Sequence, residues 1–231
     1  MKRIGILGGS SDQATAEYYR RLNAGVNRRL GGWNTAELLI SSMNFALAEA
    51  WVRQGDWDAA AQYLTDRSHA LERAGADLVL CVSNTLHRVA DAFTAGLGVP
   101  FLHIVDPTAA AIRAAGLTRV ALLGTKPVMA TDYLKRRYAE RFGVEILVPS
   151  PADQDVLDRI IFDELCRGRF LPDSKARYLA CVDELMAGGA SGVILGCTEI
   201  PLLIGQADRP AVPMFDTVAL HVEAAVELAL A

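Results

Sequence analysis

Two short polar sequences follow apolar runs, and their side chains could do acid–base chemistry. The apolar run in "LVLCVSNTLHRV", residues 78–89, ends in Ser83-Asn84-Thr85, and the run in "GVILGCTEIPLL", residues 192–203, ends in Cys197-Thr198-Glu199. A free thiol has a pKa of about 8.5, and a helix N-terminus can lower it toward neutrality, so Cys197 is a credible base at physiological pH. A serine hydroxyl is far less acidic. We therefore expect Ser83 to donate a proton or to hold a water.

Each of these residues also has a simpler structural interpretation. Asn84 and Thr85 could serve only as helix caps, and Glu199 could be an acidic residue in the first turn of a helix. His87 could be a hydrogen-bonding residue at a helix start, and Cys197 could be a buried thiol. The place of Cys197 directly after an apolar run favours a functional role.

The segments around these residues belong to an internal repeat, in which similar sequences occur once in each half of the chain. Three pairs of segments match in the same order: "RIGILGGS" from Arg3 with "RVALLGTK" from Arg119, "GADLVLCVSNT" from Gly75 with "GASGVILGCTE" from Gly189, and "VPFLHIVD" from Val99 with "VPMFDTVA" from Val212. Their offsets of 116, 114 and 113 positions are nearly equal. The chain therefore consists of two related halves.

Within each half, short apolar runs alternate with amphipathic ones, which is typical of βαβ units. We expect an α/β fold with two pseudo-symmetric halves, each a parallel sheet flanked by helices. The first lobe comprises residues 1–97 with a C-terminal segment at about 211–231, and the second comprises about 98–210. Ligands of open parallel sheets bind beyond the carboxyl ends of the strands, so the expected site is a cleft between the halves. Strands are predicted near 3–7, 37–42, 78–82, 101–104, 119–124, 144–148, 192–196 and 213–215, and helices near 14–30, 47–73, 129–141, 153–166, 174–187 and 218–230.

Composition excludes several classes of protein. The net charge of −4 leaves no basic stripe for nucleic acid, and no apolar run is long enough to span a membrane. The four cysteines form no C-x-x-C pair, and no His/Asp/Glu cluster has ligand spacing, so no metal is expected. Without an export signal the expected location is the cytoplasm. "GILGGSS" lacks the dinucleotide-binding pattern, and "GCT" and "SNT" lack the frame of a nucleophile elbow.

Three motifs resemble a known family. "GILGG" at the start, "SNTLH" in the middle and "GCTEIPLL" near the end are similar to motifs of the aspartate/glutamate racemase family, and the resemblance covers the whole chain. It implies an isomerase of D-amino acid metabolism that uses neither pyridoxal phosphate nor another cofactor, binds a small amino acid and forms a homodimer. In this family two cysteines usually stand on opposite faces of the substrate's α-carbon. One removes the proton and the other returns it to the opposite side.

The resemblance also implies roles for individual residues. Cys197 and Ser83 take the two catalytic positions, with Glu199 and His87 as proton-handling helpers beside them. The carbanion needs its carboxylate held by donors that are already oriented. Backbone N–H groups at helix starts supply such donors, and the expected substrate-binding residues are Gly9, Ser10, Ser11, Asn84, Thr85, Thr125 and Thr198. Ser10 departs from the methionine common in the family's "GGM" loop.

Ser83 stands where the family usually has its first thiol. Cys81 shares its side of the strand but lies roughly 6–7 Å further down, so it is interpreted as core. Three explanations are open. The chain belongs to a branch that pairs a hydroxyl residue with one cysteine and acts on L-aspartate or L-glutamate, the serine was engineered to trap a ligand, or the site catalyses a one-sided reaction such as decarboxylation.

The substrate also stays open at this point. Arg53, Arg167 and Arg169 are basic side chains that could hold a distal carboxylate, but none matches a family position. Relatives that act as hydantoin racemase, malonate decarboxylase or maleate isomerase fit the same motifs. A non-catalytic binder of acidic amino acids is a further alternative, against which the intact Cys197-Thr198-Glu199 argues.

Overall fold

The chain divides into two compact units in a computed structural model that describes residues 1–231. Unit 1 comprises residues 1–104 and 218–231, and unit 2 comprises residues 105–217. Both crossings between the units lie about seven residues later than the sequence predicts, which is after the last strand of each half rather than before it. In the structure that strand stays with its own half, because it pairs in parallel with the third strand of the same sheet.

Unit 1 contains a four-stranded parallel sheet in the order β2-β1-β3-β4. Its strands are β1 (Ile4–Gly8), β2 (Leu38–Ser42), β3 (Leu78–Cys81) and β4 (Phe101–Leu102). Its helices are α1 (Asp12–Leu30), α2 (Phe45–Gln54), α3 (Trp57–Arg73), the 3₁₀ helix η1 (Thr85–Val89), α4 (Ala90–Phe93) and α10 (Thr217–Leu230).

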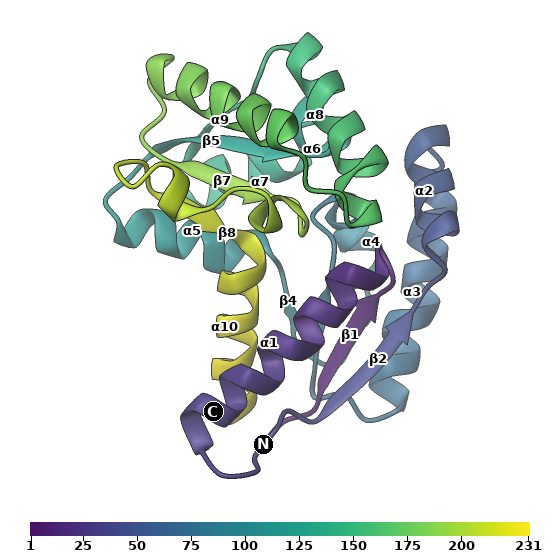
Figure 1. The fold of residues 1–231 in the computed structure, drawn as a ribbon. Helices are drawn as coiled ribbons and strands as arrows, with labels where there is room; N and C mark the ends of the chain where they lie inside the picture. The colour runs from purple at the N-terminus through teal and green to yellow at the C-terminus, as the bar shows by residue number, and fades with distance from the viewer. The chain divides into compact units, whose positions relative to one another are not determined.

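The two faces of this sheet pack against different helices (Figure 1). Successive residues of a strand point to opposite faces, so Ile4 and Ile6 contact one layer and Leu7 the other. The first layer consists of α1 and α10, whose buried residues include Tyr18 and Val226. The second layer includes α3. Helix α10 therefore completes the core of unit 1, although more than a hundred residues separate it from the rest of the unit.

Unit 2 repeats this topology with the strand order β6-β5-β7-β8, again all parallel. Its strands are β5 (Arg119–Gly124), β6 (Glu145–Leu147), β7 (Val193–Gly196) and β8 (Met214–Asp216). Its helices are α5 (Val105–Ala114), α6 (Lys126–Ala130), α7 (Tyr133–Phe142), α8 (Pro151–Asp163), α9 (Pro172–Ala187) and the 3₁₀ helices η2 (Leu165–Arg167), η3 (Ile200–Leu202) and η4 (Gln206–Asp208).

One face of the unit 2 sheet is covered by α8 and α9, and α5 and α7 contact each other beyond the other face (Figure 1). Leu123 and Leu195 pack against the buried side chains of α8 and α9, and Cys197 belongs to the same core cluster. The helices of both units lack the combination of length and hydropathy that a transmembrane span requires.

The two four-stranded sheets flanked by helices confirm the predicted fold class. The predicted helix over 47–73 is two helices, since Gly55 ends α2 in the left-handed conformation and the Asp56 side chain caps α3 by accepting from the Ala59 N–H. The predicted helix over 129–141 is likewise divided between α6 and α7. Helix α5 was not predicted.

Candidate active site

The strand register makes Ser83 and Cys197 equivalent positions of the two units. In unit 1, Leu7 of β1 pairs with Cys81 of β3, and in unit 2, Leu123 of β5 pairs with Leu195 of β7. Ser83 and Cys197 each lie two residues beyond the paired residue of the third strand. The hydroxyl and the thiol thus occupy the same place in two copies of one βαβ topology.

The Cys197 turn is buried and organised around one carboxylate oxygen. Cys197 is 8% exposed and Glu199 is 3% exposed. The Cys197 thiol donates to Glu199 Oε2 at 3.0 Å, and the Thr198 hydroxyl donates to the same oxygen. One carboxylate oxygen therefore accepts from both neighbouring side chains, which gives the thiol proton an acceptor that is already in place.

Burial holds the pKa of the Cys197 thiol well above its ordinary value, and the negative charge of Glu199 raises it further. The expected lowering of this pKa by a helix N-terminus is therefore wrong. The physical reason is that β7 leads into the short 3₁₀ helix η3 rather than into an α-helix, so there is no helix dipole to oppose the loss of solvent. Cys197 rests as a protonated thiol.

The Ser83 turn is more open to solvent than the Cys197 turn, with Ser83 half-buried. The Ser83 hydroxyl oxygen accepts from the Leu86 N–H at 3.2 Å. A hydroxyl has one hydrogen to donate, and no residue of unit 1 accepts the hydrogen of Ser83. Cys81, two residues earlier, is completely buried, and burial raises its pKa to about 12. This confirms that Cys81 is a core residue.

His87 is buried, and both of its ring nitrogens face the backbone. Nδ1 lies 2.6 Å from the Ser83 carbonyl oxygen, and the Ile104 N–H donates to Nε2 at 3.2 Å. The imidazole of His87 therefore bonds to the backbone of the Ser83 turn and to the segment that follows β4.

The Gly9-Ser10-Ser11 loop is tied into unit 1 by its own hydrogen bonds. The Gly9 N–H donates to Thr15 Oγ1 at 2.8 Å, and the Ser10 hydroxyl donates to the Val82 carbonyl. Ser11 caps α1, accepting from the Ala14 N–H at 3.0 Å. The N–H of Gly9 and the hydroxyl of Ser11 thus have structural partners, and Ser10 links the loop to the end of β3.

The polar residues Asn84 and Thr125 at the strand ends differ from Ser11 because their side chains do not cap a helix. Asn84 and Thr125 stand at the N-cap positions of η1 and α6, but neither side chain makes a capping hydrogen bond. Both are buried, whereas Thr85 and Thr198 are half-buried. The interpretation of Asn84 as nothing but a cap is therefore not supported by the geometry.

Lys126 is a basic residue at a strand end that was not predicted as a site residue. It follows Thr125 at the carboxyl end of β5, where its Nζ lies 2.5 Å from Asp155 Oδ1. Of the arginines considered from the sequence, Arg53 pairs with Glu49 on α2, and Arg167 lies 4.0 Å from Asp163. Arg169 is exposed. The position of Lys126 directly after "LLGT" could have indicated that it lies at the carboxyl end of a strand.

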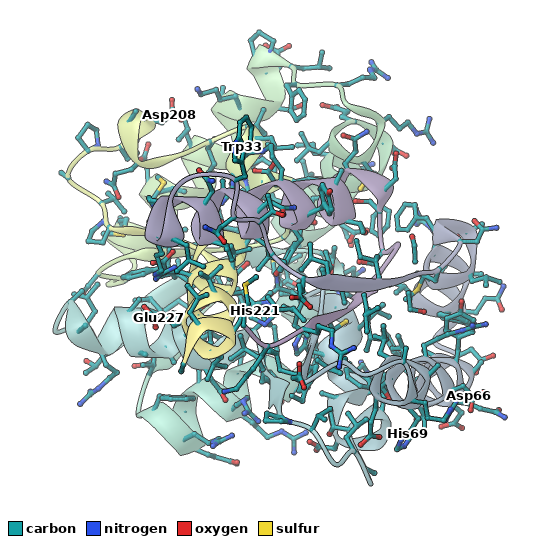
Figure 2. The ribbon with its side chains drawn as sticks, turned by 90° about the horizontal axis from the view of Figure 1, so that it is seen from below. Trp33, Asp66, His69, Asp208, His221 and Glu227 are labelled. Atoms are coloured by element: carbon teal, nitrogen blue, oxygen red, sulfur yellow. The ribbon has the colours of Figure 1, made fainter.

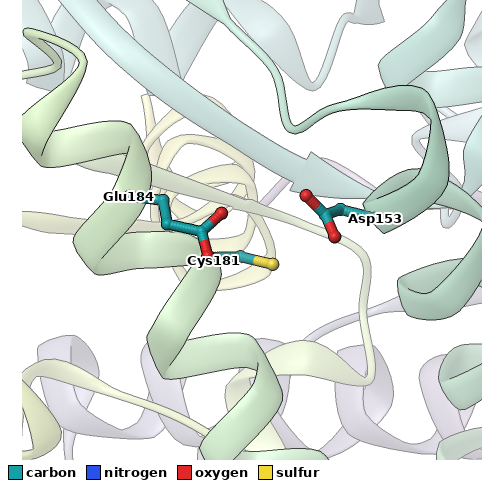
Figure 3. Close-up of side chains that lie close together, drawn as sticks. All are labelled: Asp153, Cys181 and Glu184. Atoms are coloured by element: carbon teal, nitrogen blue, oxygen red, sulfur yellow. The ribbon is translucent and has the colours of Figure 1, made fainter.

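Three potential metal ligands also meet in unit 2, between α8 and α9. Figure 3 shows Asp153 of α8 beside Cys181 and Glu184 of α9, and their ligand atoms lie within 4.8 Å of one another. Arg177 pairs with Asp153 and lies 3.9 Å from Glu184 Oε1. The guanidinium already balances both carboxylates, and the chemistry of this group therefore favours an ion-paired contact between α8 and α9.

Comparison with known proteins decides the family. Residues 4–225 match the profile of the Asp/Glu/Hydantoin racemase family. The chain belongs to this family. The crystal structure of a candidate Asp/Glu racemase from Yersinia pestis is 39% identical, with complete coverage of both chains and a TM-score of 0.92. An aspartate racemase homologue from Pyrococcus horikoshii OT3 is 36% identical, again over both complete chains, with a TM-score of 0.84.

A curated glutamate racemase from Koribacter versatilis (strain Ellin345) is 29% identical over 155 residues, which is 63% of this chain and 50% of the relative. The chain thus matches half the length of that racemase. Family members include aspartate and glutamate racemases, which are isomerases. In this racemase-family chain the two equivalent turns carry a serine at position 83 and a cysteine at position 197.

Proposed function

We propose that this chain is a cofactor-independent racemase of aspartate or glutamate, in which Cys197 exchanges the α-proton of the L-substrate and Ser83 serves the opposite face of the α-carbon. The observation that carries the proposal is the equivalence of Ser83 and Cys197 in the strand registers of the two units. Both positions follow the third strand of a parallel sheet, where such folds bind their ligands.

The proton path begins at the Cys197 thiol. Its proton passes to Glu199 Oε2 at 3.0 Å, which leaves a thiolate and a carboxylic acid. The thiolate then removes the α-proton, and the electron pair of the broken C–H bond stays on the substrate as a carbanion. Thr198 links this step to binding, because its hydroxyl donates to Glu199 Oε2. When Thr198 turns to the substrate's carboxylate, Oε2 loses one donor and becomes a better acceptor for the thiol proton.

Ser83 supplies the second proton. Its hydroxyl hydrogen has no acceptor within unit 1, and the Leu86 N–H already donates to its oxygen. Protonation of the carbanion moves that hydrogen to carbon and leaves an alkoxide, which the Leu86 N–H stabilises until solvent reprotonates it. Glu199 then releases its proton to solvent, which restores the starting carboxylate. Asn84 and Thr125 are proposed to hold the substrate's carboxylate with their side chains and Ser10 with its backbone N–H, since the Ser10 hydroxyl donates to the Val82 carbonyl. Ser11 is proposed to act as a helix cap.

An acidic amino acid is the proposed substrate class. The similarity to an aspartate racemase homologue and to a glutamate racemase supports it, and so does Lys126 at the end of β5. A dicarboxylate could compete with Asp155 for this ammonium group, which is exposed on the protein surface.

The decisive experiment follows the α-proton of L-aspartate and L-glutamate in deuterium oxide with chiral separation of the products. We expect the intact protein to incorporate deuterium into the L-substrate faster than it forms the D-enantiomer. Ser83→Ala should keep the incorporation and lose the inversion, whereas Cys197→Ala should lose both. Absence of deuterium at the α-carbon with both substrates rejects the proposal.

A one-sided protonation is the second candidate function. Its specific support is that Cys197 rests as a protonated thiol, which suits delivery of a proton to a carbanion that decarboxylation has generated. Release of carbon dioxide from an arylmalonate, without racemisation of L-aspartate or L-glutamate, would favour this reaction over the racemase.

A further inference from the structure

The hydrogen bonds of His87 define its protonation state. A backbone N–H can only donate, so the Ile104 N–H at 3.2 Å requires Nε2 to be the acceptor. The ring proton then resides on Nδ1, which donates to the Ser83 carbonyl at 2.6 Å. His87 is neutral in this arrangement, and both of its nitrogens have backbone partners.

Aromatic neighbours restrict the ring of His87. The His103 ring stands edge-on to it with centroids 4.5 Å apart, and the Phe101 ring lies at 5.6 Å. His87 itself is 3% exposed. A ring flip would bring Nδ1 to face a different part of the core and break both hydrogen bonds, so the orientation of His87 is fixed by packing as well as by polar contacts.

A second histidine holds the same segment from another side. His221 of α10 bonds through Nε2 to the Leu102 carbonyl at 2.9 Å, and the Tyr18 hydroxyl lies 2.8 Å from His221 Nδ1. Figure 2 labels His221 on α10. Residues 102–104 close unit 1 before the chain enters unit 2. This segment is therefore held by two buried imidazoles, one of which also holds the Ser83 turn.

We propose that His87 is a positioning residue, which fixes the backbone of Ser83 against the segment after β4 and does not itself transfer protons to the substrate. The inference rests on the proposed function, since it gives Ser83 a catalytic role. It replaces the proton-handling role that the family resemblance suggested for His87. A shift of about 1 Å in a reacting group can lower a rate about 100-fold, so loss of this link should affect the step that needs Ser83.

The test uses two variants that differ in the bonds they retain. His87→Leu removes both hydrogen bonds, and His87→Asn keeps a donor near the place of Nδ1. We expect formation of the D-enantiomer to fall roughly 100-fold in His87→Leu and to recover roughly tenfold in His87→Asn. Deuterium incorporation into the L-substrate through Cys197 should stay within about threefold of the unmodified protein in both variants. The shape of the pH profile of kcat should be unchanged.

His69→Leu is the matched control, because His69 on α3 also has a partner at each ring nitrogen, Glu72 and the Ala95 carbonyl, and is labelled in Figure 2. It should leave both rates unchanged. Equal losses of inversion and incorporation in His87→Asn, or the disappearance of one limb of its pH profile, would overturn the positioning role. Absence of incorporation in the unmodified protein would instead reject the proposed function.

A measurement on the unmodified protein covers the case in which a variant does not fold. The nitrogen chemical shifts of His87 should report the Nδ1–H tautomer at the pH of the racemase assay. An imidazolium that forms in parallel with a limb of the kcat profile would show that His87 handles protons, and the proposal would fall.

Discussion

Replacement of Glu199 by glutamine tests the electrostatics of the Cys197 turn directly. Glu199 Oε2 lies 3.0 Å from the Cys197 sulfur. At an effective dielectric constant of about 20, a thiolate and a carboxylate this close repel each other by about 5 kcal/mol, equivalent to roughly a 10⁴-fold change in an ionisation constant. Glutamine keeps the shape of the side chain and removes this repulsion. The pKa of Cys197 should therefore fall in Glu199→Gln.

Burial is the larger cause of the raised pKa, and it is unchanged in this variant. We therefore expect the pKa of Cys197 to stay above its ordinary value, although thiolate formation at a given pH increases. Alkylation of Cys197 by iodoacetamide at mildly alkaline pH, followed by mass spectrometry of the peptide, should accelerate roughly tenfold or more. Racemisation should fall roughly 100-fold or more, because the thiol loses its proton acceptor.

Glu184→Gln is the control for this prediction, since Glu184 is an exposed carboxylate that raises the pKa of Cys181. It should leave the alkylation of Cys197 unchanged. Slower alkylation of Cys197 in Glu199→Gln, or a thiol in the unmodified protein that already ionises at its ordinary pKa, would refute the reasoning.

Three further predictions concern stability. Gly9→Ala should destabilise unit 1 by more than about 1 kcal/mol, measured by urea unfolding. Gly9 has a φ of +86°, and an added Cβ would lie 2.1 Å from the Met43 carbonyl oxygen. An unchanged unfolding midpoint would contradict this loop geometry. Ser11→Ala should cost about 1 kcal/mol through loss of the α1 cap, with kcat retained, and a loss of kcat alone would point to substrate contact. Burial raises the pKa of Cys81 to about 12 and of Cys181 to about 11 from 9.0. Their folded forms hold protons that the unfolded chain releases, so the free energy of unfolding should fall as pH rises above about 9, less steeply in Cys81→Ala.

The positions of the strands could be predicted from the sequence because their signals are local. Short apolar runs mark all eight strands, and the two-fold repeat with offsets near 114 indicates that the two halves share one topology. Helix α5 was missed because "VDPTAAAIRA" contains few large apolar residues. The break at Gly55-Asp56 had a readable signal, since glycine followed by aspartate combines a helix end with a helix start.

The chemistry of the site was less accessible to sequence reasoning. The pKa of Cys197 is raised by burial and by the charge of Glu199. Glu199 is written in the residues "GCTE", but the burial depends on the fold. The role of His87 depends on Ile104, seventeen positions later. Such partners come together only through the fold. The sequence can therefore identify polar residues at strand ends as candidate site residues, but it does not determine the role of each.

The split composition of unit 1 has a consequence for biosynthesis. Residues 105–217 form unit 2 as one unbroken stretch, whereas α10 supplies Val222, Ala225 and Val226 to the core beneath α1. On the ribosome the first unit emerges early, yet the apolar cluster that contains Tyr18 and Leu22 of α1 is incomplete until α10 has been translated. Unit 1 should therefore begin to fold first and complete its core last. Until α10 is made, its incomplete apolar core is a site for chaperone binding or, when translation stalls, for aggregation.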